Sequence, residues 1–489
     1  MTDSLPDEWI KSNLGTILEL KYGKALPAKK RDGKGAPVYG SNGIVGNHSI
    51  PLINTAGIVI GRKGSFGEVN LVNEAFSPID TTYYIDELFE LPIKYWFYQL
   101  KKLPLTSLNR STAIPGLNRD DAYSQEIYFP PLAEQEEIVT QLDKLLAQVE
   151  SIKARLDAIP VILKQFRQSV LSDAVSGKLT EKWRVNTKLD DAKKLIENIK
   201  LARSKTYETE ISNGNSDTKR LKTKLAKHSF FIPESVIPRS WVWTSFMESL
   251  ERVVDCHNKT APYVGAGIKL IRTPDIKNGK ISLDNTKFVD EDTYAYWSRR
   301  CIPIPKDVIF TREAPMGEAG IIPENTKVCM GQRLMLLRPM MDYILPKYLL
   351  LNIMSLPFQQ RMFKSAIGTG VKHLRVADVE SLTYPLTTYK EQTEIVRRVE
   401  ELFTYADKIE QQVNAAQARV DNLTQSILAK AFSGELTAKW REKNPDLISG
   451  ENSAQTLLEK IKTKREALAQ AKKPIKKKKI TRKAATKKV

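Results

Sequence analysis

Residues 134–139 read EQEEIV, and residues 391–396 read EQTEIV. The likeness continues without a gap over residues 134–184 and 391–441, at a constant offset of 257 positions. At its end, SGKLTEKWR at residues 176–184 matches SGELTAKWR at residues 433–441. A match this long and this varied in residue type is not a product of composition. The chain is therefore built from two tandem half-units of common origin.

Apolar residues recur between these ends at alternating steps of four and three, the heptad pattern of a helix that pairs with another helix. Each copy predicts a helix of roughly 40 residues, about 60 Å long, whose apolar stripe needs a cover. We expect Pro160 to kink the first helix near Leu156, and Gly177 and Gly434 to form left-handed caps at the helix ends. The stripes comprise Ile138, Leu142, Leu145, Val149, Ile152, Leu156, Ile159, Leu163, Phe166 and Val170, and Ile395, Val399, Leu402, Ala406, Ile409, Val413, Ala416, Val420, Leu423 and Ile427.

Weaker similarity extends to both sides of the helices. LPDEW at residues 5–9 resembles IPRSW at 237–241, and residues 58–67 and 308–317 each read as a buried strand followed by a basic turn. Residues 195–200 and 457–462 predict a short amphipathic helix in each half. Residues 204–227 are polar and read as a flexible linker that joins the halves.

A chain of 489 residues divides into several domains. We expect an α+β protein in which two mixed α/β domains are separated by two long helices that form an antiparallel coiled coil, as a pseudo-twofold tandem repeat. The expected boundaries are 1–132 for the first mixed domain, 133–203 for the first helical region, 204–235 for the linker, 236–388 for the second mixed domain, 389–470 for the second helical region and 471–489 for a disordered basic tail.

Charge favours a polyanionic partner, because the formal net charge is +19. Ten Lys or Arg residues and no acids lie between 472 and 488, which leaves +9 on the rest of the chain. Whether this basic tail binds phosphates or is a solvated appendage stays open. No apolar run is long enough to span a bilayer, and the N-terminus lacks signal-peptide character, so we expect a soluble, cytoplasmic protein. Cys256, Cys301 and Cys329 are expected to be reduced and mostly buried.

Motifs for catalysis are missing from the sequence. There is no G-x-x-x-x-G-K-[ST] phosphate loop and no H-E-x-x-H zinc motif, and the four histidines are scattered. The glycine-rich residues 40–46 lack a following helix of dinucleotide-binding type and read as a turn. FPPL at residues 129–132 lacks the polar and aromatic flanks of an adenine methyltransferase motif and reads as the exit of a strand. We therefore expect no catalytic residues, no metal and no cofactor.

Loops of the two mixed domains carry cations and short hydrogen-bonding side chains on glycine-bearing turns, as DNA recognition requires. For each single residue, an ordinary surface role remains an equal alternative. The candidates are Ser41, Asn42, Arg62, Lys63, Ser65, Asn109, Arg110, Ser111, Thr112 and Asn118 in the first domain, and Arg272, Lys277, Asn278, Arg312, Thr369, Lys372, His373 and Arg375 in the second.

These features together resemble the specificity subunit of type I restriction-modification enzymes. The resemblance rests on the two EQ-x-E-I helix starts, the two SG-x-LT-x-x-WR ends and the turns at residues 39–46 and 61–67. It implies two target-recognition domains that each read one half of an interrupted double-stranded DNA sequence. It also implies that the helices set the gap and dock two modification subunits, which bind S-adenosylmethionine and methylate adenine. Further restriction subunits would cut DNA using ATP.

Two other classes of function remain to be weighed. One is an enzyme with an unrecognised methyltransferase or nuclease site, which the missing motifs disfavour. The other is a non-catalytic coiled-coil protein that binds DNA or regulates without a modification partner. Co-purification of a modification subunit in excess over this chain would distinguish the specificity subunit from both.

Overall fold

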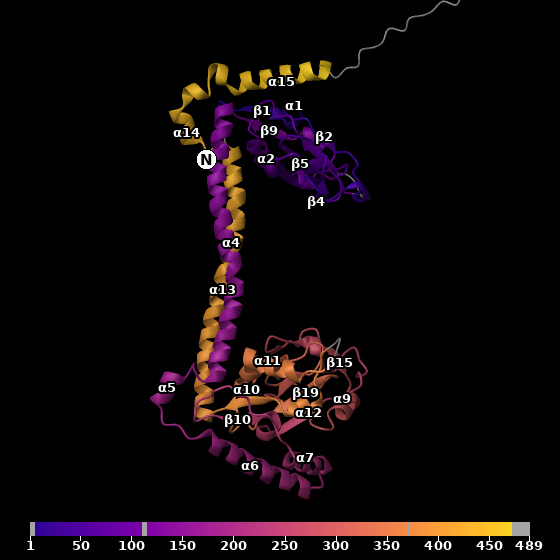
Figure 1. Cartoon of the computed structure of the whole chain (residues 1–489), viewed down its shortest axis with the longest axis vertical. Helices are drawn as coiled ribbons and strands as arrows, with labels where there is room; N and C mark the ends of the chain where they lie inside the picture. The colour runs from indigo at the N-terminus through magenta and orange to yellow at the C-terminus, as the bar shows by residue number, and fades with distance from the viewer. Residues whose placement is uncertain (1–4, 110–114, 369–371, 472–489) are drawn as a thin grey trace, which may run out of the picture. The chain divides into compact units, whose positions relative to one another are not determined.

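The computed structural model describes residues 5–109, 115–368 and 372–471 (Figure 1). Its residues form two compact units. Unit 1 contains residues 1–157 and 414–489, and unit 2 contains residues 158–413. Each unit thus combines one mixed domain with one part of each long helix, so residues distant in sequence share a core.

Unit 1 contains three small sheets. The largest has the strand order β2-β8-β5-β6 and is antiparallel throughout, whereas the second, β4-β3-β7, pairs β3 with β7 in parallel. A third sheet pairs β1 with β9. The strands are β1 (Ile10–Asn13), β2 (Lys21–Tyr22), β3 (Ala36–Gly40), β4 (Gly43–His48), β5 (Gly57–Gly61), β6 (Val69–Val72), β7 (Ser77–Pro78), β8 (Thr82–Ile85) and β9 (Glu126–Phe129).

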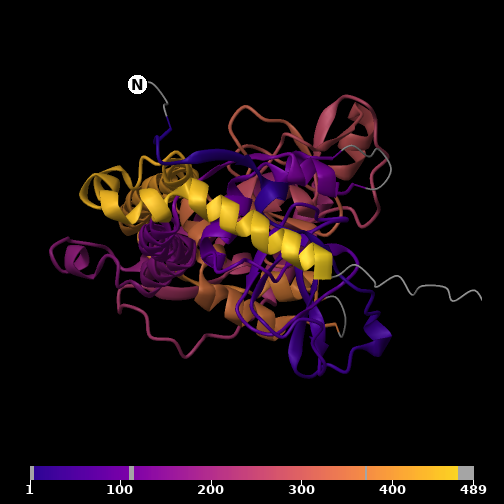
Figure 2. The ribbon, with the colours of Figure 1, turned by 90° about the horizontal axis from the view of Figure 1, so that it is seen from above.

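Short helices and the long helices complete unit 1. Trp96 and Phe129 of the domain share one buried cluster with Leu142 and Phe432 of the long helices. Figure 2 shows α15 as a separate yellow helix, and the Arg465 guanidinium joins it to the first domain by donating to Gly15 O at 2.8 Å. The helices are α1 (Leu14–Ile17), η1 (Ala28–Lys30), α2 (Ile93–Lys102), η2 (Leu105–Ser107), α3 (Arg119–Tyr123), α14 (Ala438–Lys443), η4 (Pro445–Leu447), η5 (Gly450–Asn452) and α15 (Ala454–Ala471).

Unit 2 repeats this architecture in its strands. Its four-stranded sheet has the order β11-β19-β16-β17, and its three-stranded sheet, β15-β12-β18, again contains one parallel pair, β12 with β18. The strands are β10 (Val242–Ser245), β11 (Arg252–Asp255), β12 (Ile268–Ile271), β13 (Ile276–Lys277), β14 (Lys280–Ile281), β15 (Lys287–Val289), β16 (Val308–Thr311), β17 (Ala319–Ile321), β18 (Val328–Met330), β19 (Leu334–Arg338) and β20 (Thr383–Leu386).

The two mixed domains therefore share one fold, because corresponding strands pair with the same neighbours in the same direction. β10 pairs with β20 as β1 pairs with β9. The β13-β14 hairpin is an addition in the second domain. The remaining helices of unit 2 are α5 (Glu181–Val185), α6 (Ala192–Ser212), α7 (Ser216–Ala226), α8 (Phe246–Ser249), η3 (Thr273–Asp275), α9 (Glu291–Trp297), α10 (Pro346–Met354), α11 (Leu356–Ser365) and α12 (Val376–Glu380).

The predicted long helices are α4 (Leu132–Ser176) and α13 (Tyr389–Phe432), and both pass from one unit into the other. Within unit 1, Lys153 Nζ lies 3.0 Å from Asp421 Oδ1. Within unit 2, Arg167 Nη2 lies 2.7 Å from Asp407 Oδ1.

A second contact in each unit gives the direction of the helices. In unit 1, Gln417 Nε2 donates to Asp157 Oδ1 at 2.7 Å. In unit 2, Arg398 Nη1 donates to the O of Leu179, just after α4, at 2.8 Å. In each unit the residue number on α13 therefore falls as that on the first half-unit rises, so the helices run antiparallel. The expected coiled coil is confirmed.

Half of the twenty heptad positions are buried and most of the others are half-buried, so the cover is uneven. Leu142 and Val399 are almost fully buried, whereas Ile152 and Leu423 are 43% and 46% exposed. Helix α4 continues through Pro160 without a break in its helical assignment. Gly177 and Gly434 have φ of +80° and +82°, as expected of left-handed caps.

The prediction that residues 204–227 form a flexible linker is wrong. Residues of this segment form the second half of α6 and all of α7. Buried Tyr207 donates through its hydroxyl to Glu251 O at 2.8 Å, and Thr218 is also buried. Contacts with the second domain therefore stabilise helices whose polar composition alone suggested disorder. The amphipathic helices expected at 195–200 and 457–462 exist as the longer α6 and α15.

The basic tail at 472–489 lies outside the described residues. Among the residues that the structure describes, no helix has the length and apolar character needed to cross a membrane.

Candidate nucleic-acid interface

A buried glutamate joins each mixed domain to the long helices. In unit 1, Glu134 is fully buried at the start of α4 and accepts from Trp9 Nε1 at 2.8 Å. Its other carboxylate oxygen accepts from Thr437 Oγ1 at 2.6 Å and from Arg441 Nη1 at 2.5 Å. One carboxylate therefore binds the domain, α4 and the segment after α13 together.

Unit 2 contains the same arrangement with the roles of the half-units exchanged. Glu391 accepts from Trp241 Nε1 at 2.8 Å, from Thr180 Oγ1 at 2.8 Å and from Arg184 Nε at 2.8 Å. Thus the SG-x-LT-x-x-WR segment that follows one long helix completes the carboxylate site at the start of the other. We call Glu134 and Glu391, with their Trp, Thr and Arg donors, the two glutamate hubs.

The capping glycines belong to the same contacts. A Cβ atom on Gly177 would lie 2.4 Å from Cγ of Pro238, and one on Gly434 would lie 2.5 Å from Cγ of Pro6. These prolines precede the tryptophans of the hubs in both P-x-x-W segments. The repeated motifs predicted a duplication and the glycine caps, but the sequence analysis missed that the motifs bind one another across half-units.

Loops of the first domain meet at one place through backbone hydrogen bonds. Arg62 N donates to Thr81 O at 2.8 Å, and Leu117 N donates to Arg62 O at 2.9 Å. Ser41 Oγ also donates to Thr81 O, at 2.6 Å. The β3-β4 turn, the β5-β6 loop, the β7-β8 turn and the segment before α3 therefore form one loop cluster, as a binding surface made of separate segments requires.

The second domain has the equivalent loop cluster. Arg312 N donates to Arg333 O at 2.9 Å, and Leu374 N donates to Arg312 O at 3.1 Å. Arg62 and Arg312 thus occupy equivalent positions, each between a β-turn and the segment that leads to α3 or α12. The structure brings most of the predicted loops together, separately in each domain.

Individual candidates in the first domain differ in how free their side chains are. Asn42, Lys63 and Ser65 are exposed. Ser41 is buried, and Arg62 donates through Nη2 to Asp80 O at 2.8 Å while lying 5.2 Å from the centre of the Tyr22 ring. These two side chains support the loops.

Two further candidates of the first domain also have structural partners. Asn118 caps α3 by accepting from Asp120 N at 2.8 Å, and Asn109 Oδ1 accepts from Gly116 N at 3.3 Å. Arg110, Ser111 and Thr112 lie outside the described residues.

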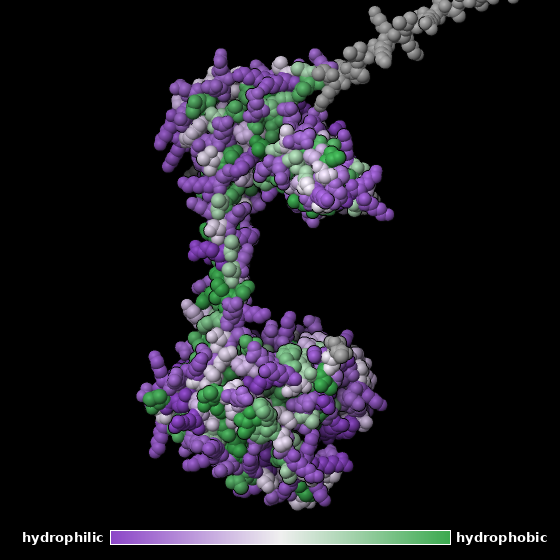
Figure 3. All heavy atoms as spheres, in the orientation of Figure 1, coloured by the Kyte–Doolittle hydropathy of each residue, from purple (hydrophilic) through white to green (hydrophobic). Residues whose placement is uncertain are grey.

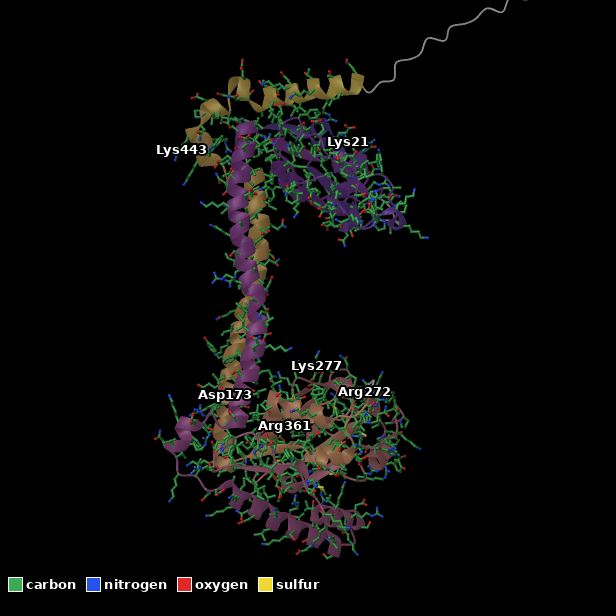
Figure 4. The ribbon with its side chains drawn as sticks, viewed as in Figure 1. Lys21, Asp173, Arg272, Lys277, Arg361 and Lys443 are labelled. Carbon is green, nitrogen blue, oxygen red and sulfur yellow. The ribbon has the colours of Figure 1, made fainter. Side chains whose placement is uncertain are left out.

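In the second domain, Lys277, Lys372 and Arg375 are exposed. Asn278 occupies the turn of the β13-β14 hairpin with φ of +53°, and its N–H donates to Glu318 Oε2 at 2.7 Å. Arg312 donates to Leu374 O at 2.8 Å and thereby helps to hold the loop cluster. Figure 4 shows Arg272 and Lys277 on the same part of this domain.

The last two candidates are less informative. His373 takes part in the cluster through its backbone, which pairs with Ile367 and Glu313. Thr369 lies outside the described residues.

A family model for the type I restriction modification DNA specificity domain matches residues 6–161 and 255–416. These two matches cover more than half of the chain. The chain belongs to this family. Each match runs from one mixed domain into the long helix that follows it, so the duplication seen in the fold is a duplication of the family's own unit.

Full-length relatives agree with this assignment of a specificity subunit. The chain is 32% identical to the type I restriction enzyme EcoBI specificity subunit of Escherichia coli, over 95% of this chain and 94% of the relative. It is 33% identical to the EcoDI specificity subunit of Escherichia coli, over 95% and 96%. The expected family, fold class and function as a DNA specificity subunit are confirmed.

Among solved structures, one described as showing complex assembly and conformational transition of the type I R-M system has a TM-score of 0.53 with this specificity subunit. Its sequence identity is 15%, over 88% of this chain and 98% of the other. At this identity the likeness concerns the fold alone, and it supports two mixed domains alternating with two long helices.

The thiols of this specificity subunit are free, and Cys256 and Cys329 are buried. Burial raises the pKa of the Cys329 thiol to about 12, so it stays protonated and unreactive near neutral pH. Within the described parts of the chain, no group of His, Cys, Asp or Glu side chains is arranged to hold a metal ion.

Proposed function

We propose that this specificity subunit reads a two-part, asymmetric DNA sequence, with residues 1–132 and 236–388 as the target-recognition domains. The observation that carries the proposal is that both domains share one strand order but present different side chains from equivalent loops. A common framework with divergent loops suits two readers of different sequences. The net charge of +19 suits a polyanion.

We further propose that the subunit performs no chemistry itself and directs two modification subunits, and with them restriction subunits, to the target. Exposed apolar side chains on the long helices support docking of the modification subunits on these helices. Apolar surface in contact with water is unfavourable, and a partner that covers it removes this cost. Ile152 and Leu423 are exposed in unit 1, and Val161, Ile162 and Tyr405 are 59%, 57% and 62% exposed in unit 2. Figure 3 shows hydrophobic atoms at the surface of these helices.

Exchange of one domain tests the proposed modular reading. We expect that replacing residues 1–129 with the equivalent domain of another specificity subunit changes one half of the methylated sequence and leaves the other half intact. The measurement is long-read detection of methylated adenine in cells that carry the chimaera with its modification subunits. Rewriting of both halves, or of neither, would reject the modular function.

The gap between the half-sites provides a second test. Because α4 and α13 pair antiparallel, we expect that one heptad added to each helix lengthens the connection by about 10 Å, or roughly three base pairs. Each half-site should keep its sequence. Insertion into α4 alone serves as the control, since it breaks the helix pairing and should abolish methylation. An unchanged gap in the double insertion would show that the helices do not set the spacing.

A further inference from the structure

The second domain contains a cavity beside its loop cluster. It has a volume of about 180 Å³ and lies between the loop after β11, the end of β12 and the β18-β19 turn. Arg272, Gln332, Arg333, Thr260 and Tyr263 contribute its polar lining. Because these residues come from three separate segments, sequence patterns did not predict the cavity.

Two guanidinium groups line this cavity, and each is held by one carboxylate. Arg272 Nε lies 3.4 Å from Asp275 Oδ2, and Arg333 Nε lies 3.5 Å from Glu313 Oε2. A guanidinium has five N–H donors, so one long ion pair orients the group and leaves donors for a ligand. The side chain of Arg333 is 45% exposed, and that of Arg272 is 30% exposed.

The backbone of Arg333 is also unusual. Its φ of +71° lies in the left-handed region. Residues with bulky side chains rarely adopt this backbone conformation unless the surrounding structure holds them in it. The turn therefore fixes the direction of the Arg333 side chain, although this backbone conformation costs some free energy.

Comparison with the first domain shows that the two arginines are specific to the second. Ile79 N donates to Tyr39 O at 2.9 Å, and Gly331 N donates to Ile271 O at 2.7 Å. Tyr39 and Ile271 therefore hold equivalent positions in β3 and β12. The residues that follow them, Gly40 and Arg272, are equivalent as well.

The bond from Arg62 N to Thr81 O likewise corresponds to that from Arg312 N to Arg333 O. It makes Thr81 the equivalent of Arg333, and Asp80 the equivalent of Gln332. On the same framework, the first domain thus presents Gly, Asp and Thr where the second presents Arg, Gln and Arg.

We propose that Arg272 and Arg333 read a guanine in the half-site of the second domain by donating to its O6 and N7 atoms in the major groove. This inference rests on the proposed two-part DNA recognition. Guanine presents two acceptors there, and arginine is the side chain that most often contacts them. Cytosine presents a donor and needs an acidic reader, and the cavity lining contains no carboxylate among the described residues.

Adenine is a weaker fit to this cavity. Its usual reader is an amide side chain that both donates and accepts. The carbonyl oxygen of Gln332 already accepts a long hydrogen bond from Thr260 Oγ1, at 3.4 Å. Guanine is therefore the base that the donor-rich cavity favours.

Methylation by the complete modification complex tests the proposal with the variants Arg333→Gln and Arg272→Gln. The matched control is Arg299→Gln, an exposed arginine of the same domain that does not line the cavity. The half-site of the second domain is the one that stays unchanged when the first domain is exchanged. We expect either cavity variant to weaken the preference for guanine at one position of that half-site. Discrimination at that position should fall by about 5- to 150-fold. The other half-site and the gap should be unchanged in these variants, and Arg299→Gln should methylate the same sequence as the wild type.

A second measurement needs no protein variant. Placing 7-deazaguanine at the same position removes the N7 acceptor, and we expect it to weaken binding by the wild-type complex at least about fivefold. The same base placed in the gap is the control and should have no effect.

Three results would overturn the inference. They are a second half-site without guanine, an unchanged affinity for the 7-deazaguanine probe, and variants that weaken binding to all sequences equally. The last result would identify phosphate contacts, with a lower dependence of binding on salt. If the wild-type complex instead methylated no defined two-part sequence, the proposed function itself would fail.

Discussion

Replacing Glu391 with alanine should lower the free energy of unfolding of unit 2 by about 3–5 kcal/mol, the usual effect of removing one partner from a buried ion pair. Glu391 is fully buried and accepts hydrogen bonds from Trp241, Thr180 and Arg184. Without the carboxylate, the indole and hydroxyl lose an acceptor, and the guanidinium is left as a poorly hydrated charge. Urea unfolding followed by the fluorescence of tryptophan, which includes Trp241 at the hub, provides the measurement.

Glu401→Ala is the matched control for this change. Glu401 lies on the same helix and is 70% exposed in its ion pair with Arg397, so its removal should cost less than about 1 kcal/mol. Glu134→Ala should produce the large effect in unit 1, because Glu134 likewise accepts from a tryptophan, a threonine and an arginine. Equal effects of Glu391→Ala and the control would show that the hub does not stabilise the fold.

Replacing Leu142 with alanine should destabilise unit 1 by about 2–5 kcal/mol, the range for truncating a buried leucine. Leu142 is fully buried and belongs to the cluster that joins the first domain to α4 and α13. The truncation removes apolar contacts and leaves a cavity between elements that are far apart in sequence. The measurement is again the urea midpoint, with an unchanged dependence on denaturant concentration showing that the folded state is retained.

Ile152→Ala is the comparison for Leu142→Ala, because Ile152 occupies a position of the same heptad stripe but is 43% exposed. We expect it to cost about 1 kcal/mol or less. A loss as large as that at Leu142 would mean that the helices pack more closely around Ile152 than the structure shows. For binding of the modification subunits we expect the opposite order, with the larger loss of affinity for Ile152→Ala, since Ile152 belongs to the exposed apolar surface proposed to dock a partner.

Sequence alone determined the duplication, the two long helices, the mixed domains and the family. These features depend on local periodicity and on residues repeated at a fixed offset, both of which are visible along a single chain. The same local reasoning misread residues 204–227 as a linker. The partners that stabilise α6 and α7, such as Glu251 and Glu380, come from elsewhere in the chain.

Only the tertiary structure decided which residues meet. Glu134 contacts Thr437 and Arg441 about three hundred positions away. Arg272, which follows β12, and Arg333, in the β18-β19 turn, line one cavity. It also showed that Ser41, Arg62 and Asn118 support loops, whereas Asn42, Lys63 and Lys277 are exposed. The physical reason is that a hydrogen bond depends on where the backbone brings two groups in space, whereas composition and periodicity report only what neighbouring residues prefer.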